Sequence, residues 1–280
     1  LLSDRLADAL RADLVERYRP DWIYSSTSQQ LERVTQEEAE LHPEVVLLLS
    51  TSGSTGSPKF VRLTRRNIEA NAESIMAALG INAQDRPVAH LPIHYSYGLS
   101  VLNSHLLAGA TVVLTESSLM SADFWETIRQ HQVNSFSGVP YTYQMLRRLG
   151  LAKVNVPGIR IMTQAGGKMD PANIAFFHEQ MVERGGTFWV MYGQTEATAR
   201  IAILHPENLP EKLGSAGRAI PRGRLAVRRD DGTLTTEAGV EGELVYEGPN
   251  VMMGYAWGRA DLAQGDELNG HLETGDRAHL

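Results

Sequence analysis

Residues 45–60 read VVLLLSTSGSTGSPKF, an apolar run that leads directly into a loop of glycine, serine and threonine. The run at 45–49 predicts a strand that is buried on both faces. The loop offers many backbone N–H groups, several hydroxyls and the cation of Lys59, which are the groups needed to hold a polyphosphate. A flexible surface connector is the alternative, but a connector does not require this composition at the end of a buried strand.

The loop differs from a Walker phosphate loop, in which Gly-Lys is followed by Ser or Thr at the start of a helix. Here Lys59 follows Pro58, and residues 60–63 read as a second strand. We therefore expect the loop to join two strands as a clasp over the β- and γ-phosphates of a nucleotide.

Helices and strands alternate along the chain from residue 64 to residue 191. Helices are expected at 64–79, 99–107, 121–131, 141–149 and 171–184, and strands at 88–91, 111–114, 133–136, 159–164 and 187–191. This alternation predicts an α/β fold, with a layered parallel-sheet body and crossover helices. Upstream of the glycine-rich loop, the pattern predicts a helix at 3–18, a strand at 21–24, a loop at 25–34 and a short helix that begins near Thr35.

The pattern changes near residue 214 to short strands separated by turns. The turn at 230–232 contains Asp-Gly, a strong hairpin signal, between expected strands at 225–228 and 242–246. We therefore expect an α/β body of two sub-lobes over 1–213 and a small antiparallel, β-barrel-like unit at the C-terminal end, over 214–280.

The composition excludes several classes of function. The 280 residues include no cysteine, which removes disulfides, thiolate metal sites and cysteine nucleophiles. The formal net charge of −7 argues against a nucleic-acid partner. The apolar runs, such as 45–49, are too short to span a bilayer, so no membrane partner is expected. A cytoplasmic location is compatible with the absence of cysteine.

Three other segments follow predicted strands, at the end of a parallel sheet where α/β proteins bind ligands. They are Gln164–Lys168 with its two glycines, Tyr192–Glu196, and the segment 92–98 that contains His94. Each has a structural alternative, namely a turn, the start of a helix, or a histidine that only packs. A fourth segment, Thr274-Gly275-Asp276, offers a carboxylate that could accept hydrogen bonds from a ribose.

These segments, in this order, resemble the motifs of the adenylate-forming superfamily of acyl- and aryl-CoA synthetases, nonribosomal adenylation domains and luciferases. TSGSTGSPK at 51–59 is similar to the phosphate-loop signature, and YGQTE at 192–196 to the Tyr-Gly-x-Thr-Glu motif. GEL at 242–244 with GPNVMMGY at 248–255 resembles the family's β-unit motif, and TGD at 274–276 its ribose-binding motif. The resemblance covers nearly the whole chain.

The resemblance implies that ATP or AMP, Mg²⁺ and coenzyme A are bound, and that the substrate is a carboxylic acid. It implies catalytic roles for His94 beside the acyl carboxylate, Thr195 at the α-phosphate and Glu196 as a Mg²⁺ ligand, together with Thr51. The nucleotide-binding residues that it implies are Thr51, Ser52, Gly53, Ser54, Thr55, Gly56, Lys59, Ala165, Gly166, Gly167, Tyr192 (stacked on adenine), Gly193 and Asp276 (on the ribose). Further pocket walls are expected at Gly138, Val139 and Tyr141.

Members of this superfamily carry a C-terminal domain after the Thr-Gly-Asp motif, and this domain supplies a catalytic lysine. Because the sequence stops at Leu280, we expect the chain to lack that domain and the first hundred or so residues of the family. The 280-residue piece would then bind nucleotide weakly and adenylate poorly.

The resemblance leaves three functions open. The first is an acyl- or aryl-CoA ligase, which residues 93–96 favour because they lack the aspartate of amino-acid-activating domains. The second is an adenylation enzyme that loads the thiol of a carrier protein. The third is a non-catalytic nucleotide-binding module. A homodimer is a further expectation, since dimers are common among enzymes.

Overall fold

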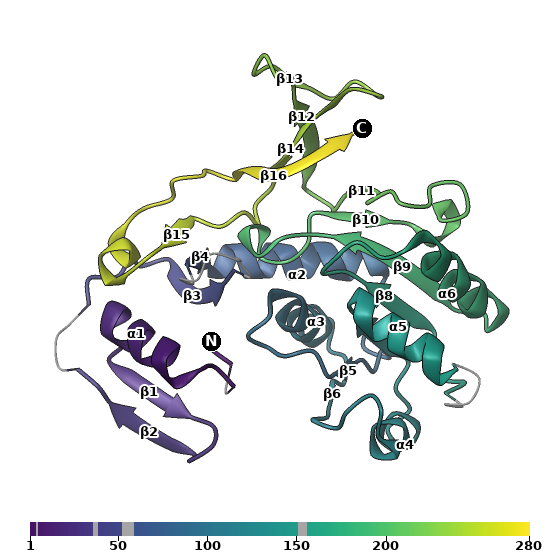
Figure 1. Ribbon diagram of the computed structural model, residues 1–280, viewed down its shortest axis with the longest axis horizontal. Coiled ribbons are helices and arrows are strands. Elements are labelled where there is room, and N and C mark those ends of the chain that lie inside the picture. Colours follow the sequence, from purple (N-terminus) through teal and green to yellow (C-terminus); the bar gives the residue numbers. More distant parts are fainter. Residues whose placement is uncertain (4, 36–38, 52–58, 151–155) are drawn as a thin grey trace.

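A computed structural model of the protein describes residues 1–3, 5–35, 39–51, 59–150 and 156–280. Its largest sheet has five strands and lies beside a smaller hairpin sheet, with helices packed on both (Figure 1). In spatial order the strands of the large sheet are β11 (Arg218–Ala219), β10 (Ala202–Leu204), β9 (Thr187–Tyr192), β8 (Ile161–Gln164) and β7 (Ser135–Gly138). A layered α/β fold, as expected, is therefore confirmed.

The large sheet changes direction at β9. Strands β7, β8 and β9 are parallel, whereas β10 and β11 continue the sheet antiparallel. On the other side, β5 (Val88–Ala89) pairs in parallel with β6 (Val113–Leu114), and a parallel bridge from Pro87 to Ser135 connects this pair to β7. The predicted parallel body is thus present, with an antiparallel edge that the sequence pattern did not indicate.

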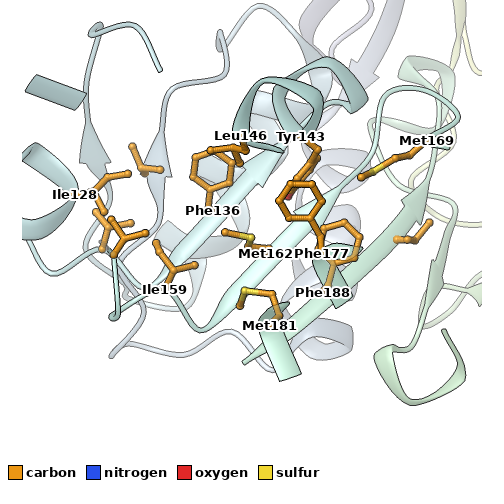
Figure 2. Close-up of a cluster of buried hydrophobic side chains, with 14 of the residues drawn as sticks. Ile128, Phe136, Tyr143, Leu146, Ile159, Met162, Met169, Phe177, Met181 and Phe188 are labelled. Carbon is orange, nitrogen blue, oxygen red and sulfur yellow. The ribbon is translucent and has the colours of Figure 1, made fainter. Parts of the chain in front are cut away.

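Side chains of β9 alternate between two buried layers, which is the period of an extended strand. Phe188 and Val190 belong to the larger core with helices α4 (Ala122–Gln130), α5 (Pro140–Leu149) and α6 (Pro171–Glu183). Figure 2 shows this core, in which Phe188 lies beside Phe177 and Tyr143. Trp189 and Met191 belong to a separate core with helix α3 (Ser96–Leu107). The sheet is therefore covered on both faces.

Local sequence accounts for where the helices begin and end. Helix α2 (Arg65–Leu79) starts with a capping box, in which the Thr64 hydroxyl accepts a hydrogen bond from Asn67 N and the Asn67 side chain accepts one from Thr64 N. The helix ends at Gly80, which has φ +68°. Helix α6 is capped by the carboxylate of Asp170, which accepts hydrogen bonds from Ala172 N and Asn173 N. Such caps satisfy backbone N–H groups that have no partner inside the helix.

The segment 45–60 forms the hairpin that its pattern predicts. Strands β3 (Val45–Ser50) and β4 (Phe60–Thr64) are antiparallel, and β15 (Gly254–Ala256) adds a third strand to β4. Thr51 N donates to Lys59 O at 3.2 Å, where the loop begins and ends. The loop residues between them, 52–58, lie outside the described residues.

A fully buried arginine connects this hairpin to the C-terminal segment. Arg62 Nε donates to Tyr255 O at 3.2 Å, and its guanidinium forms an ion pair with Glu267 at 3.1 Å. Backbone carbonyls of Gln264 and Gly265 accept from the same group. A buried cation is tolerated when it is paired and hydrogen-bonded in this way.

A second antiparallel sheet lies at the C-terminal end, with strands β13 (Leu234–Thr235), β12 (Arg224–Arg228), β14 (Glu241–Glu247) and β16 (His271–His279). The Asp-Gly turn closes β12 onto β13, with Gly232 at φ +85°. Strands β11 and β15 also fall in 214–280, but they pair with the large sheet and with β4. The division of the chain at residues 213 and 214 stays a prediction.

The N-terminal segment differs most from expectation. Helix α1 (Asp8–Tyr18) begins five residues later than predicted, and the expected loop contains strand β2 (Gln30–Arg33), which pairs with β1 (Trp22–Ser25). The pattern concealed this strand because β2 is exposed along its whole length and so shows no apolar alternation. Of the helix expected from Thr35, residues 36–38 lie outside the described residues and 39–42 are not helical.

Helix α3 begins at Ser96, three residues before its predicted start, and Gly98 in its first turn packs closely against the preceding segment. A Cβ atom at Gly98 would lie 2.3 Å from the carbonyl oxygen of Pro92. Three short 3₁₀ helices, η1 (Thr195–Ala197), η2 (Pro206–Asn208) and η3 (Arg259–Ala263), complete the elements found in the described residues. Within the described ranges, every helix is too short or too polar to cross a bilayer.

Phe188→Ala tests the larger core. Phe188 is fully buried among aromatic rings, so its truncation leaves a cavity and should lower the free energy of unfolding by about 3–5 kcal/mol. Urea denaturation followed by circular dichroism measures the change. Leu114→Ala, at a side chain that is 72% exposed, is the control and should change stability little. A loss below about 1 kcal/mol for Phe188→Ala would contradict this account of the core.

His90 gives the fold a predictable dependence on pH. Its ring stacks on Phe136 at 4.8 Å between centroids, and neither ring nitrogen has a hydrogen-bond partner in the described part of the chain. Burial lowers the pKa of His90 from 6.5 to about 4, because the charged ring is poorly solvated there. The unfolded chain therefore takes up this proton more readily than the folded chain.

The stability that neutral His90 contributes is complete above pH 6.5 and is lost as the pH falls towards 4. Between pH 7.5 and 4.5 we expect the wild type to lose roughly 2 kcal/mol more than His90→Phe. Urea midpoints at the two pH values measure this difference. His131→Phe, at an exposed histidine, should keep the wild-type dependence; equal slopes for wild type and His90→Phe would exclude the assignment.

Candidate functional site

A cleft of about 480 Å³ lies at the carboxyl ends of β8 and β9. Ala165 and Gly166 follow β8, and residues 193–196 follow β9. Because β8 and β9 are parallel neighbours, their carboxyl ends meet at one edge of the sheet. The other walls come from the β3–β4 hairpin, the start of α3, and strands β15 and β16. They contribute Thr51, Lys59, Tyr95, Ser96, Tyr97, Tyr255, Glu273 and Thr274.

One wall of the cleft holds a carboxylate at the hydroxyl of a tyrosine and a cation over the ring of the same tyrosine. Tyr255 donates its hydroxyl hydrogen to Glu196 Oε1 at 2.8 Å, and Lys59 Nζ lies 3.5 Å from the centre of the Tyr255 ring. Burial, with the nearby Glu196 carboxylate, raises the pKa of Tyr255, so the phenol stays protonated and donates. The tyrosine thus holds both charged groups at the cleft.

A second cluster connects Tyr192 with Asp276, 84 residues later in the chain. Tyr192 Oη donates to Asp276 Oδ2 at 2.5 Å, and Gln194 Nε2 donates to the same oxygen at 3.0 Å and to Thr274 O at 2.8 Å. Burial and the Asp276 carboxylate raise the pKa of Tyr192, which keeps its hydroxyl protonated. These bonds connect strand β16 to the end of β9.

Two glycines allow the walls of the cleft to approach each other. A Cβ atom on Gly166, which has φ +81°, would lie 2.2 Å from Tyr95 Oη. A Cβ atom on Gly193 would lie 1.8 Å from the carbonyl oxygen of Ala199, where the chain returns towards β10. Any larger residue at either position would displace backbone or a fixed ring.

Hydroxyl groups also face one another across the cleft. Ser96 Oγ at the start of α3 lies 3.2 Å from Thr195 Oγ1 in η1. Thr51 Oγ1, at the end of β3, is buried and has no hydrogen-bond partner among the described residues. An unpartnered buried hydroxyl is unfavourable unless a ligand atom satisfies it.

The site has few groups that could hold a metal ion. In the ranges that the structure describes, three or more His, Asp or Glu side chains nowhere gather in a metal-binding cluster. Glu196 and Thr51 offer a carboxylate and an unpartnered hydroxyl in the same cleft. This oxygen set fits Mg²⁺, which commonly takes one or two protein carboxylates and completes its shell with phosphate and water.

The structure brings together about half of the predicted site. Of the residues expected from sequence, those that line the cleft are Thr51, Lys59, Ala165, Gly166, Gly193, Thr195 and Glu196. Tyr192 and Asp276 are bonded to Gln194, which lines the cleft, but they are not themselves among its lining residues. The predicted residues Ser52, Gly53, Ser54, Thr55 and Gly56 lie outside the described residues.

The remaining predicted residues lie apart from the cleft walls. The segment that contains His94 contributes Tyr95, Ser96 and Tyr97 to the cleft, but not His94 itself. Gly167 accepts a hydrogen bond from Gln164 Nε2 at 2.8 Å and is not a lining residue.

The three residues expected as further pocket walls have different surroundings. Val139 packs against Tyr95 and Ala165, beside the cleft. Gly138 is buried below Thr142 and Tyr143. Tyr141 is 66% exposed at the start of α5 and is not a lining residue.

Sequence reasoning missed Arg200 and Glu273 as lining residues, and assigned no role to Tyr255. The motif that ends at Tyr255 was recognised, but the pattern could not show that its ring meets Lys59. Arg200 carried one signal, because it is the single charged residue in the apolar run 197–204. A lone arginine in such a run is either buried with partners or held for a ligand.

Comparison with known proteins is consistent with this arrangement. The family model described as "AMP-binding enzyme" matches residues 3–256. The 2-succinylbenzoate–CoA ligase of Bacillus subtilis (strain 168) is 36% identical over 234 residues, covering 83% of this chain and 46% of the relative. The chain spans about half the length of the curated relatives it matches.

Solved structures agree with the sequence comparison. O-succinylbenzoate coenzyme A synthetase from Bacillus subtilis in complex with AMP has a TM-score of 0.71 and 33% identity, covering 89% of this chain and 50% of that one. The same enzyme in complex with ATP and magnesium ion has a TM-score of 0.70 and 32% identity, covering 89% and 51%.

Gly193→Ala tests the close approach at the end of β9. The added methyl group would collide with the Ala199 carbonyl, so the variant should lose about 1–3 kcal/mol of stability. Thermal unfolding followed by circular dichroism measures the loss. Gly265→Ala is the matched control, because its added Cβ meets no atom within 4 Å. Equal midpoints for both variants would contradict the described packing.

Proposed function

The chain belongs to the AMP-binding enzyme family, and from this premise we propose that the complete protein uses ATP to activate a carboxylic acid and then forms a thioester. In the first step a carboxylate oxygen bonds to the α-phosphorus of ATP and pyrophosphate leaves. In the second step a thiol sulfur bonds to the acyl carbon and AMP leaves. The carrying observation is that residues 51, 59, 165–166, 193–196 and 274, far apart in sequence, line one cleft.

The hairpin end of the cleft suits the polyphosphate of ATP. The Lys59 ammonium is held on the Tyr255 ring beside the Thr51 hydroxyl, which has no described partner. A cation and free hydrogen-bond donors here would neutralise charge on the departing pyrophosphate. Thr195, whose hydroxyl faces Ser96, would contact the α-phosphate.

The sheet end of the cleft suits the nucleoside. Gly166 exposes its backbone beside Tyr95, so a flat base could approach without meeting a side chain. Tyr192 would stack on adenine, with Gly167 and Ala165 nearby. Asp276, which accepts from Tyr192 and Gln194, would also accept hydrogen bonds from the ribose hydroxyls.

Glu196, with Thr51, would hold a magnesium ion. Mg²⁺ supplies charge neutralisation for the phosphates when it is bound. Tyr255 keeps Glu196 oriented towards the cleft through the 2.8 Å hydrogen bond. The acyl carboxylate would lie near α3, where Tyr95 lines the cleft directly and His94 would act from the adjacent position.

Coenzyme A is the acceptor that we propose, because the curated relatives at 36% and 34% identity are named CoA ligases. The chain covers only about half of those proteins, and their named substrate, 2-succinylbenzoate, is not assigned to this chain. A carrier-protein thiol is the alternative acceptor, and supplying each thiol to the acyl-adenylate separates the two.

A non-catalytic nucleotide-binding module is the third function, and it predicts binding of ATP without pyrophosphate release. The cytoplasmic location and a homodimer remain proposals that accompany the enzyme function. Cell fractionation tests the location and light scattering tests the dimer.

Glu196→Gln and Lys59→Ala test the polyphosphate end with the complete natural protein. Each change removes a charge from the cleft, so kcat/KM for ATP should fall by about 100-fold. Pyrophosphate release in the presence of a panel of carboxylic acids measures the rate. Tyr255→Phe, which keeps the ring under Lys59 and removes only the bond to Glu196, should fall between these variants and the wild type.

Matched controls are Glu207→Gln and Lys212→Ala, both at exposed positions away from the cleft. Both should keep the wild-type rate. Unchanged rates in the two cleft variants, in a protein that releases pyrophosphate, would refute their roles. Absence of acid-dependent pyrophosphate release from the wild type would instead refute the proposed reaction.

A further inference from the structure

A buried cation without a counter-charge lies in the wall of the cleft. The Arg200 side chain is 2% exposed, and its Nε is buried with no hydrogen-bond partner. Within the described ranges no carboxylate forms an ion pair with it and no acceptor bonds its guanidinium. A buried charge in this condition is strongly unfavourable unless an anion or acceptor arrives to satisfy it.

Arg62 shows what a structural arginine looks like in the same protein. It is equally buried, but three backbone carbonyls and the Glu267 carboxylate surround its guanidinium. Arg200 has only the face of Tyr97, whose ring centre lies 4.8 Å from Cζ. The contrast indicates that the Arg200 guanidinium is not needed to hold the fold together.

The backbone of Arg200 is nevertheless held firmly. Its carbonyl accepts hydrogen bonds from Asn71 Nδ2 at 3.2 Å and from Asn250 Nδ2 at 2.9 Å. Gly193 leaves room for the chain to pass at this point. The guanidinium therefore starts from a fixed position, which is the arrangement expected of a preorganised binding group.

The neighbouring phenols cannot supply the missing negative charge. Burial raises the pKa of both Tyr95 and Tyr97, so both rings are neutral near pH 7. Tyr97 Oη is also occupied, because it donates to Thr163 O at 2.9 Å. The anion must therefore come from a ligand.

The position of Arg200 indicates which part of a ligand it meets. Arg200 and Tyr97 line both the cleft and a small inner cavity of about 10 Å³ behind it. That cavity holds roughly one water molecule, so a ligand cannot extend far beyond Arg200. Thr195 and Lys59, which are proposed to face the phosphates, line the cleft but not this inner cavity. Arg200 thus lies at the closed, acyl end.

We propose that Arg200 binds a second carboxylate of the acyl substrate, and that the substrate is a short dicarboxylic acid. One carboxylate would be activated beside Thr195, and the other would pair with the guanidinium in the bidentate geometry that arginine favours. The apolar face of Tyr97 would support the short chain between them. This inference rests on the proposed function, because it names the substrate class of the same site.

The first test compares acids of equal length with the complete natural protein. Pyrophosphate release is measured with succinate and glutarate, and with butyrate and valerate, which lack only the second carboxylate. The dicarboxylic acids should have kcat/KM about 30-fold higher or more, as expected when a buried charge is paired rather than left alone. Equal activity with the monocarboxylic acids, or activity confined to long or aromatic acids, overturns the inference and leaves the proposed function standing.

The second test uses Arg200→Met with Arg65→Met as control, since Arg65 is 82% exposed at the start of α2. Arg200→Met should lose the activity with succinate and glutarate by about 30-fold and keep that with butyrate and valerate. A uniform loss with all four acids overturns the inference, because it indicates a role at the phosphate. If Arg200→Met does not fold, the comparison of acids in the wild type decides alone. Absence of release with every acid overturns the proposed function and this inference together.

Discussion

The return of the chain from β9 to β10 is the constraint on which the rest of the site depends. Because β10 is antiparallel to β9, nine residues must leave the sheet and come back to the adjacent position, where Ile201 N donates to Tyr192 O at 2.9 Å. Only a glycine at 193 lets the outgoing and returning backbones pass. The turn places Thr195 and Glu196 over the end of the sheet and brings Arg200 back into the wall of the cleft.

This turn does not hold its shape alone. Thr198 has φ +65°, an unfavourable value for a β-branched residue, and its hydroxyl donates to Asn250 O at 2.7 Å. The Asn250 amide donates to the carbonyls of Ala197 and Arg200, and Tyr246 Oη donates to its Oδ1. The C-terminal segment thus acts as a support for a loop some 50 residues earlier, and the strain of the loop is balanced by bonds from another part of the fold.

Contacts between segments that are distant in the chain also explain the polar walls of the cleft. Strand β15 pairs with β4, and this pairing brings Tyr255 between Lys59 and Glu196. Strand β16 brings Asp276 to Tyr192. The two buried arginines differ in their partners: Arg62 joins these segments through three backbone carbonyls and the Glu267 carboxylate, whereas Arg200 keeps its guanidinium for a ligand.

The sequence by itself determined the parts of the protein whose physics is local. Apolar periodicity placed most of the helices and strands, and the YGQTE segment with the two ends of the glycine-rich loop, Thr51 and Lys59, marked parts of the cleft wall. Only the tertiary structure decided which groups meet. It put Tyr95 rather than His94 on the cleft, placed Tyr255 beside Lys59, and left the buried Arg200 Nε without a hydrogen-bond partner among the described residues. These outcomes depend on pairings between strands far apart in the chain, and periodicity within one segment carries no information about them.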